Sequence, residues 1–123
     1  MDFKKLLAYQ KSFDLAMFIF ELTKSFPKEE TYSLTDQVRR SSRSVTANIA
    51  ESYRKRRYLK HFISKLTDAD AENSETSTWL DYAFACNYIK KEDYTKCVNE
   101  CKEIGKLINY MINNPDKFGV NCD

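Results

Sequence analysis

The sequence predicts an all-α protein, an up-down-up-down antiparallel four-helix bundle. Glycine and proline number only two each among 123 residues, so the chain has few of the residues that tight turns require. Apolar residues recur every three or four positions along most of its length, the period that gives a helix one apolar face. Short connections between such segments favour antiparallel neighbours. The length is that of one domain; we place the bundle at residues 1–115 and a loose C-terminal tail at 116–123.

The first helix is expected from about Lys4 to Ser25, because Pro27 and a polar stretch follow it. One face carries a row of apolar side chains: Leu15, Phe18, Ile19, Leu22 and Phe26. The second helix should begin after Ser33, whose hydroxyl suits an N-cap. Its apolar stripe consists of Leu34, Val38, Val45, Ile49 and Tyr53. Small residues lie between these positions, so this helix is expected at the centre of the packing.

The third helix is expected over residues 58–88, after a turn of four consecutive cations at 54–57. The middle of its apolar face is unusual, because Asn73 and Thr76 stand where large apolar residues are expected. The fourth helix is expected over residues 92–113. Two acidic residues open it at the positive end of the helix dipole, and the proline that follows stops it.

Several classes of function find no support in the residues. No apolar run approaches the roughly 20 residues that span a bilayer, and the N-terminal segment lacks a signal-peptide pattern, so a cytoplasmic location is expected. Cys86, Cys97, Cys101 and Cys122 are expected as reduced thiols. Cys97 and Cys101 are one helical turn apart, but His61 is the only histidine and no second pair completes a metal site. We therefore expect no catalytic residue, metal or cofactor.

The net charge of +2 conceals a strong segregation of charge. Residues 36–65 hold nine Lys/Arg against two acids, whereas residues 66–103 hold nine Asp/Glu against four lysines. Eight of the cations are candidate phosphate contacts for RNA or DNA: Arg39, Arg43, Arg54, Lys55, Arg56, Arg57, Lys60 and Lys65. Such contacts bind the backbone without reading base sequence. In the competing interpretation, the acidic third helix neutralises the charge of the basic segment, within the bundle or between subunits.

A line of polar residues advances along the second helix beside its apolar stripe. Its members are Gln37, Arg40, Ser44, Asn48 and Glu51. A partly buried charge in this line needs a partner, and Glu72 and Glu75 on the third helix are the candidates for Arg40. We predict a structural polar network of Gln37, Arg40, Asn48, Glu51, Glu72 and Glu75 that fixes helix register or a subunit contact. The alternative is a binding site for a polar ligand.

Several motifs match a known family, in order and over nearly the whole chain. They are Phe3-Lys4-x-Leu6, Gln10-Lys11, Phe26-Pro27-Lys28-Glu29-Glu30, Gln37-Val38-Arg39-Arg40 and Asn48-Ile49-Ala50-Glu51. These motifs resemble the four-helix-bundle proteins of the 23S rRNA intervening-sequence family, one branch of which accompanies the reverse transcriptases of diversity-generating retroelements. The family's matched positions here are Gln37, Arg39, Arg40, Asn48 and Glu51.

The resemblance implies a ring-like homopentamer whose basic surface meets RNA or DNA, with a reverse transcriptase as a further partner in the retroelement branch. This chain has Thr46 near the family's usual proline and Ser52 at its usual glycine, which implies a straighter second helix that runs on into Arg54. We therefore expect a non-enzymatic, homo-oligomeric nucleic-acid-binding protein. The alternative is an assembly or adaptor protein whose basic segment pairs with the acidic third helix of a neighbouring subunit.

Overall fold

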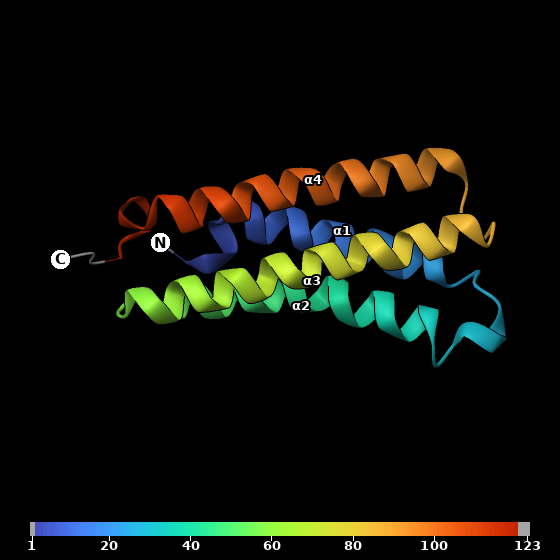
Figure 1. Cartoon of the computed structure of the whole chain (residues 1–123), viewed down its shortest axis with the longest axis horizontal. Helices are drawn as coiled ribbons and strands as arrows, with labels where there is room; N and C mark the ends of the chain where they lie inside the picture. The colour runs from blue at the N-terminus through green and yellow to red at the C-terminus, as the bar shows by residue number, and fades with distance from the viewer. Residues whose placement is uncertain (1, 121–123) are drawn as a thin grey trace.

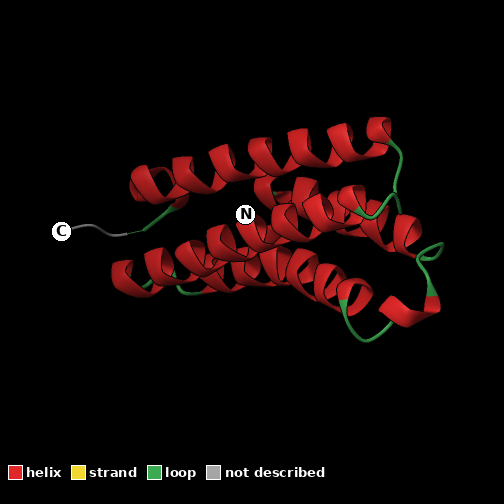
Figure 2. Cartoon of the chain, turned by 45° about the vertical axis from the view of Figure 1, so that its right-hand side comes forward, coloured by secondary structure: helices red, strands yellow, loops and turns green. Residues whose placement is uncertain are grey.

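The computed structural model describes residues 2–120 and contains four long helices (Figure 1). They are α1 (Leu7–Thr23), α2 (Leu34–Arg54), α3 (Leu59–Ala85) and α4 (Lys91–Asn113). Three short 3-10 helices accompany them: η1 (Phe3–Lys5), η2 (Lys28–Glu30) and η3 (Pro115–Phe118). The rest of the described chain is loops and turns, without a strand (Figure 2). The predicted all-α class is confirmed.

The long helices begin and end within a few residues of their predicted positions. The first is shorter than expected, because residues 3–5 form η1. α2 runs without a break to Arg54, as the replacement of the family's glycine by Ser52 implied. Ser33 does precede α2, but its hydroxyl donates to Glu30 Oε1 at 2.6 Å and caps no backbone N–H of the helix. The predicted side-chain N-cap is therefore wrong.

Successive helices run in opposite directions, which gives the predicted up-down-up-down bundle (Figure 1). The most extensive helix contact joins α2 to α3, and α2 also packs on α1, while α4 packs on α3 and α1. α2 therefore lies at the centre of the packing, as predicted. The α2–α3 turn lies at the same end of the bundle as η1 and η3, and the other two connections lie at the opposite end (Figure 1).

The core is built from the apolar stripes of all four helices. The most deeply buried large side chains are Ile19, Ile49, Phe62, Leu66 and Ile108. Burial of one such side chain stabilises the fold by about 1.5–3 kcal/mol. Short polar side chains of α2 are buried as well, among them Ser41, Ser42, Thr46 and Ser52. Because these side chains are small, α1 and α3 can approach α2 closely.

The end of the described chain packs onto the bundle. After η3, Gly119 adopts a φ of +82° and turns the chain back, so that Val120 is buried with 5% exposure. Arg56 Nη1 donates to the carbonyl oxygen of Phe118 at 3.2 Å and holds this segment against the α2–α3 turn. The expected loose tail is therefore wrong for residues 116–120. The packing of this segment depends on one apolar side chain, Val120, and on the positive φ of Gly119, and neither produces a periodic pattern that the sequence would show. Residues 121–123 lie outside the described residues.

The two glycines should respond in opposite ways to the same substitution. Gly119→Ala is expected to lower the free energy of unfolding by about 1–2 kcal/mol, because an L side chain is strained at positive φ. Its Cβ would also lie 3.0 Å from Arg56 Nη1. Gly105→Ala is expected to raise that free energy by up to about 1 kcal/mol through helix propensity, since its Cβ would meet Asn73 Nδ2 at an ordinary 3.5 Å. Urea unfolding measures both; equal effects would contradict the assignment.

Candidate nucleic-acid interface

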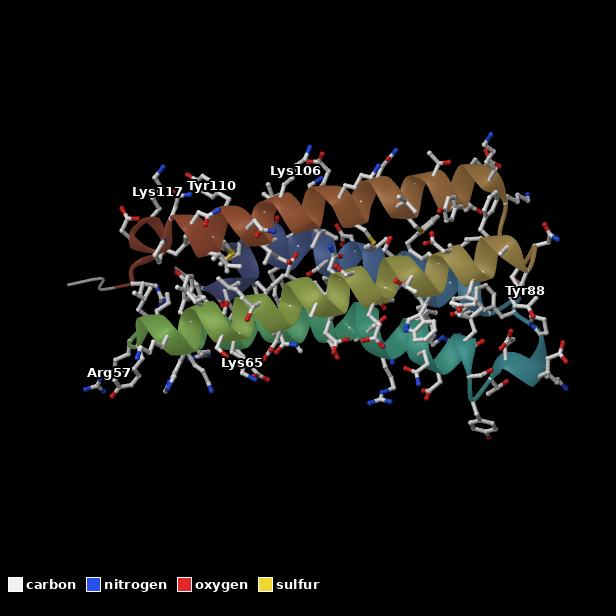
Figure 3. All side chains as sticks on the ribbon, in the orientation of Figure 1. Arg57, Lys65, Tyr88, Lys106, Tyr110 and Lys117 are labelled. Atoms are coloured by element: carbon white, nitrogen blue, oxygen red, sulfur yellow. The ribbon has the colours of Figure 1, made fainter. Side chains whose placement is uncertain are left out.

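The eight cations predicted to contact phosphate have three different kinds of surroundings. Arg39 and Arg43 lie beside α1, where their guanidinium carbons are 4.7 and 5.5 Å from the ring centroid of Phe20. Arg56 and Lys65 are engaged with other groups of the chain. The remaining four are exposed around the α2–α3 turn and form what we name the basic turn: Arg54, Lys55, Arg57 and Lys60. Figure 3 shows Arg57 extending outward from this end of the bundle.

Two of the predicted cations have structural roles that limit their availability to a ligand. Arg56 is half-buried; its Nε donates to the Tyr53 carbonyl oxygen at 2.7 Å, and its guanidinium lies 3.5 Å from the Tyr53 ring centroid. Lys65 Nζ lies 3.0 Å from Glu51 Oε2, and this hydrogen bond and charge raise the pKa of Lys65. Arg56 thus braces the turn, and the charge of Lys65 is partly neutralised.

Arg39 joins the end of α1 to α2. Its Nε donates to the buried Thr23 Oγ1 at 2.7 Å, and the side chain is half-buried. Arg43, one turn further along α2, is exposed and makes no ion pair within residues 2–120. Of this pair, Arg43 is therefore the one with its hydrogen-bond donors available.

The predicted polar network is spread over the surface. Arg40 and Glu51 are exposed, and Gln37 and Asn48 on α2 and Glu72 and Glu75 on α3 are half-buried. Glu51 pairs with Lys65, Asn48 Nδ2 donates to the Ser44 carbonyl oxygen at 2.9 Å, and Glu75 Oε1 accepts from Trp79 Nε1 at 3.2 Å. Most of these contacts are local.

The expected attraction between Arg40 and Glu72 is present without direct contact. Burial is the main cause that raises the pKa of Glu72, and the charge of Glu75 adds to it, while Arg40 lowers it. Arg40 nevertheless forms no ion pair with either carboxylate within the described residues. The two glutamates therefore give the middle of α3 a negative surface beside the exposed Arg40.

Three buried hydrogen bonds that cross between helices belong to a second set of polar residues, the polar layer: Ser12, Ser41, Thr46, Asn73 and Thr76. Thr46 Oγ1 lies 3.0 Å from Ser12 Oγ, and Thr76 Oγ1 lies 2.8 Å from Ser41 Oγ. Asn73 Nδ2 donates to the Cys101 carbonyl oxygen at 2.8 Å. These three bonds join all four helices. Asn73 and Thr76 were visible in sequence as polar residues on an apolar face, but their partners, Cys101 on α4 and Ser41 on α2, were not.

Asn73 carries the one buried side-chain polar atom without a hydrogen bond in the part of the chain that the structure describes, its Oδ1. Asn73→Asp is expected to lower the free energy of unfolding at neutral pH by about 3–5 kcal/mol, because it places an unpaired charge in the core. Burial raises the folded-state pKa of the new carboxyl, so the loss should shrink as pH falls and the group is protonated. Thermal unfolding at several pH values measures the effect. Asn109→Asp, on the exposed face of α4, is the control; an equal loss there would contradict the interpretation.

A groove between α1 and α2 adjoins Arg43. It is lined by Phe3, Tyr9, Phe13, Ala16, Met17, Arg43, Thr46, Ala47 and Ala50, and its volume is about 450 Å³. We name it the aromatic groove. Apolar side chains dominate the lining, and Arg43 supplies its charge. Sequence reasoning missed this groove, because the first helix was read only for its core-facing stripe. The row of Tyr9, Phe13 and Met17, each one turn from the next, was the signal in the sequence; Tyr9 is half-buried, and Phe13 and Met17 are exposed.

The described residues offer little to metal or thiol chemistry. No group of three or more His, Cys, Asp or Glu side chains within residues 2–120 is placed to hold a metal ion. Cys97 and Cys101 are free and buried, and burial raises the pKa of both thiols to about 12. Cys86 is free and exposed, and Cys122 lies outside the described residues. Over the same range, no helix combines the length and the hydropathy of a membrane span.

Comparison with known proteins gives a consistent result. The family model described as "23S rRNA-intervening sequence protein" matches residues 4–110. Among solved structures, the chain is similar to a protein of unknown function from the S23 ribosomal protein family of Bacteroides thetaiotaomicron. The two are 32% identical, the match covers 87% of this chain and 96% of the other, and the TM-score is 0.78. No curated protein matches. The range matched by the family model includes the basic turn and all of the aromatic groove except Phe3.

Proposed function

Because the chain belongs to the 23S rRNA-intervening sequence protein family, we propose that it is a non-enzymatic, homo-oligomeric protein that binds the phosphate backbone of RNA or DNA. We propose the pentameric ring that the family resemblance implies as its assembly, and the cytoplasm as its location. A reverse transcriptase is a further partner if the gene belongs to the retroelement branch. The proposed contacts are the basic turn and Arg43, with Arg39 and Lys65 beside them.

The observation that supports this proposal is the state of the basic turn. Its four cations lie within seven residues of sequence, and none takes part in the ion pairs of the described chain. Like charges held this close repel one another. A polyanion relieves that repulsion and releases its own counterions when it binds. The remaining predicted cation, Arg56, supports the site indirectly, because it fixes the conformation of the turn.

Removing two phosphate contacts should reduce the salt dependence of binding. The double variant Lys55→Gln, Lys60→Gln is expected to lower the slope of log K against log salt by about 1.4 for single strands and about 1.8 for duplexes. Fluorescence anisotropy with labelled RNA and DNA of mixed sequence, titrated at several salt concentrations, measures the slope. Lys90→Gln, Lys91→Gln at the opposite end of the bundle is the matched control and should leave the slope unchanged. Absence of binding by the unaltered protein at low salt would refute the function.

A second candidate function is assembly, and the acidic surface of α3 favours it. Glu72 and Glu75 are half-buried on this surface. Glu75 accepts a hydrogen bond from Trp79, whose ring lies 5.9 Å from that of Tyr82. The basic turn and this acidic surface are different patches of one chain. A contact that joined them would therefore be heterologous, and repetition of such a contact closes a ring when the rotation allows.

Charge reversal in the basic turn separates the two candidates. Arg54→Glu, Arg57→Glu leaves the structural Arg56 in place. If the turn binds nucleic acid, this variant loses RNA binding and keeps its assembly mass in light scattering. If the turn instead contacts α3 of a neighbour, the variant falls apart into smaller species, and a compensating Glu72→Lys, Glu75→Lys change restores the mass. We expect the first result.

A further inference from the structure

The aromatic groove presents large apolar side chains that nothing in the described chain covers. Phe13 is 48% exposed and Met17 is 46% exposed, although both lie on a helix whose opposite face fills the core. Contiguous apolar surface of this kind marks a binding site more often than an isolated exposed residue does. The groove volume of about 450 Å³ lies within the range of ligand sites.

Three aromatic rings follow one another along the groove. The Phe3 and Tyr9 ring centroids are 5.3 Å apart with an interplanar angle of 62°. The Tyr9 and Phe13 centroids are 6.2 Å apart with an angle of 21°, so these two rings lie nearly parallel. Tyr9, Phe13 and Met17 are spaced at four-residue intervals, about 6 Å along the helix axis. Flat ligands could therefore stack at successive positions along one line.

Arginines lie at both ends of this row. The Arg54 guanidinium carbon is 5.6 Å from the Phe3 ring centroid at one end. At the other end Arg43 lines the groove and lies 5.5 Å from the Phe20 centroid. A guanidinium that contacts an aromatic ring keeps N–H donors for bidentate binding of a phosphate. The groove thus combines an apolar floor with one guanidinium in its lining, Arg43, and a second, Arg54, beside Phe3 at its end.

We propose that the aromatic groove binds single-stranded RNA or DNA, with bases stacked on Tyr9 and Phe13 and phosphates held by Arg43 and Arg54. This inference rests on the proposed function and narrows its ligand. A duplex hides the faces of its bases in its own stack, so it reaches the arginines and leaves the groove empty. An unpaired strand presents a base face and a phosphate together. Every base has a π-face, so such stacking tolerates any sequence.

Other ligands match the rings and arginines of the groove less well. An acidic amphipathic helix would also fit a basic rim around an apolar floor. Its aliphatic side chains are not flat, however, and gain nothing specific from nearly parallel rings. A second copy of the chain could cover Phe13 and Met17, but Arg43 and Arg54 would then need acidic partners in the same contact. Both alternatives change the outcome of the experiment below.

The experiment compares a labelled 20-mer single strand of mixed sequence with the duplex of the same sequence, by anisotropy over a series of salt concentrations. The single strand should bind at least about tenfold more tightly than the duplex. Phe13→Leu keeps an apolar side chain but removes the ring, and it should weaken single-strand binding at least about fivefold without changing the salt slope. Arg43→Gln should instead lower the slope by about 0.7. Tyr32→Leu, which removes an exposed aromatic ring just before α2, is the control and should change neither quantity.

The outcomes separate this inference from the function on which it rests. Equal affinity for the single strand and the duplex, with unaltered affinity in Phe13→Leu, would overturn the single-strand assignment and leave backbone binding intact. Absence of all binding by the unaltered protein would overturn both. A lower assembly mass of Phe13→Leu in light scattering would place a second copy in the groove and overturn the assignment. Loss of single-strand affinity at constant mass and constant slope is the supporting result.

Discussion

The close packing of α2 against its neighbours is the constraint on which the rest of the structure depends. Short hydroxyl side chains on α2 let α1 and α3 approach, and the buried hydroxyls then require hydrogen bonds. The Ser12–Thr46 and Ser41–Thr76 contacts meet that requirement. A displaced helix would leave Thr46 Oγ1 and Asn73 Nδ2 without their partners in the core. Ser12, Ser41 and Thr76 also bond to carbonyl oxygens of their own helices. The polar layer therefore fixes how the helices align as well as how closely they pack.

That register also sets the outer surface. Ser12 is followed by Phe13 and Thr46 by Ala47, so the bond that aligns α1 with α2 places these two groove residues beside each other. Arg43 and Arg54 are eleven residues apart, close to three full helical turns, and therefore lie on one side of α2. The arginines and the aromatic rings meet because a buried hydrogen bond holds their helices in register. The buried hydrogen bonds thus determine where the residues of the candidate site lie, although no buried residue contributes a charged side chain to it.

Most of the fold and part of the candidate site could be predicted from the sequence, for physical reasons that particular residues illustrate. The four helices were predictable, since amphipathic periodicity is a local property. The roles of Ser33, Arg56 and Val120 depend on groups distant in space or on a single dihedral angle, and no pattern in sequence records them. The predicted polar network through Arg40 makes mostly local contacts within the described residues. A small difference in helix phase separates a half-buried position from an exposed one, and the buried hydroxyls of Ser41 and Thr46 lie just beside the polar line on α2.

Long-range charge and short-range stacking act at different distances in the proposed interface. The lysines of the basic turn lie at the end of the bundle, where their field extends about 8–10 Å into a solution of physiological ionic strength, so they attract a polyanion before contact. The aromatic groove acts only in contact, because stacking requires a base face against a ring. Arg54 belongs to both, since it is a member of the basic turn and lies over the ring of Phe3. A strand first held at the turn by its phosphates therefore has a continuous path into the groove. The core has no need of an exposed Phe13 or Met17, and in the proposed interface this path gives them a physical reason to remain exposed.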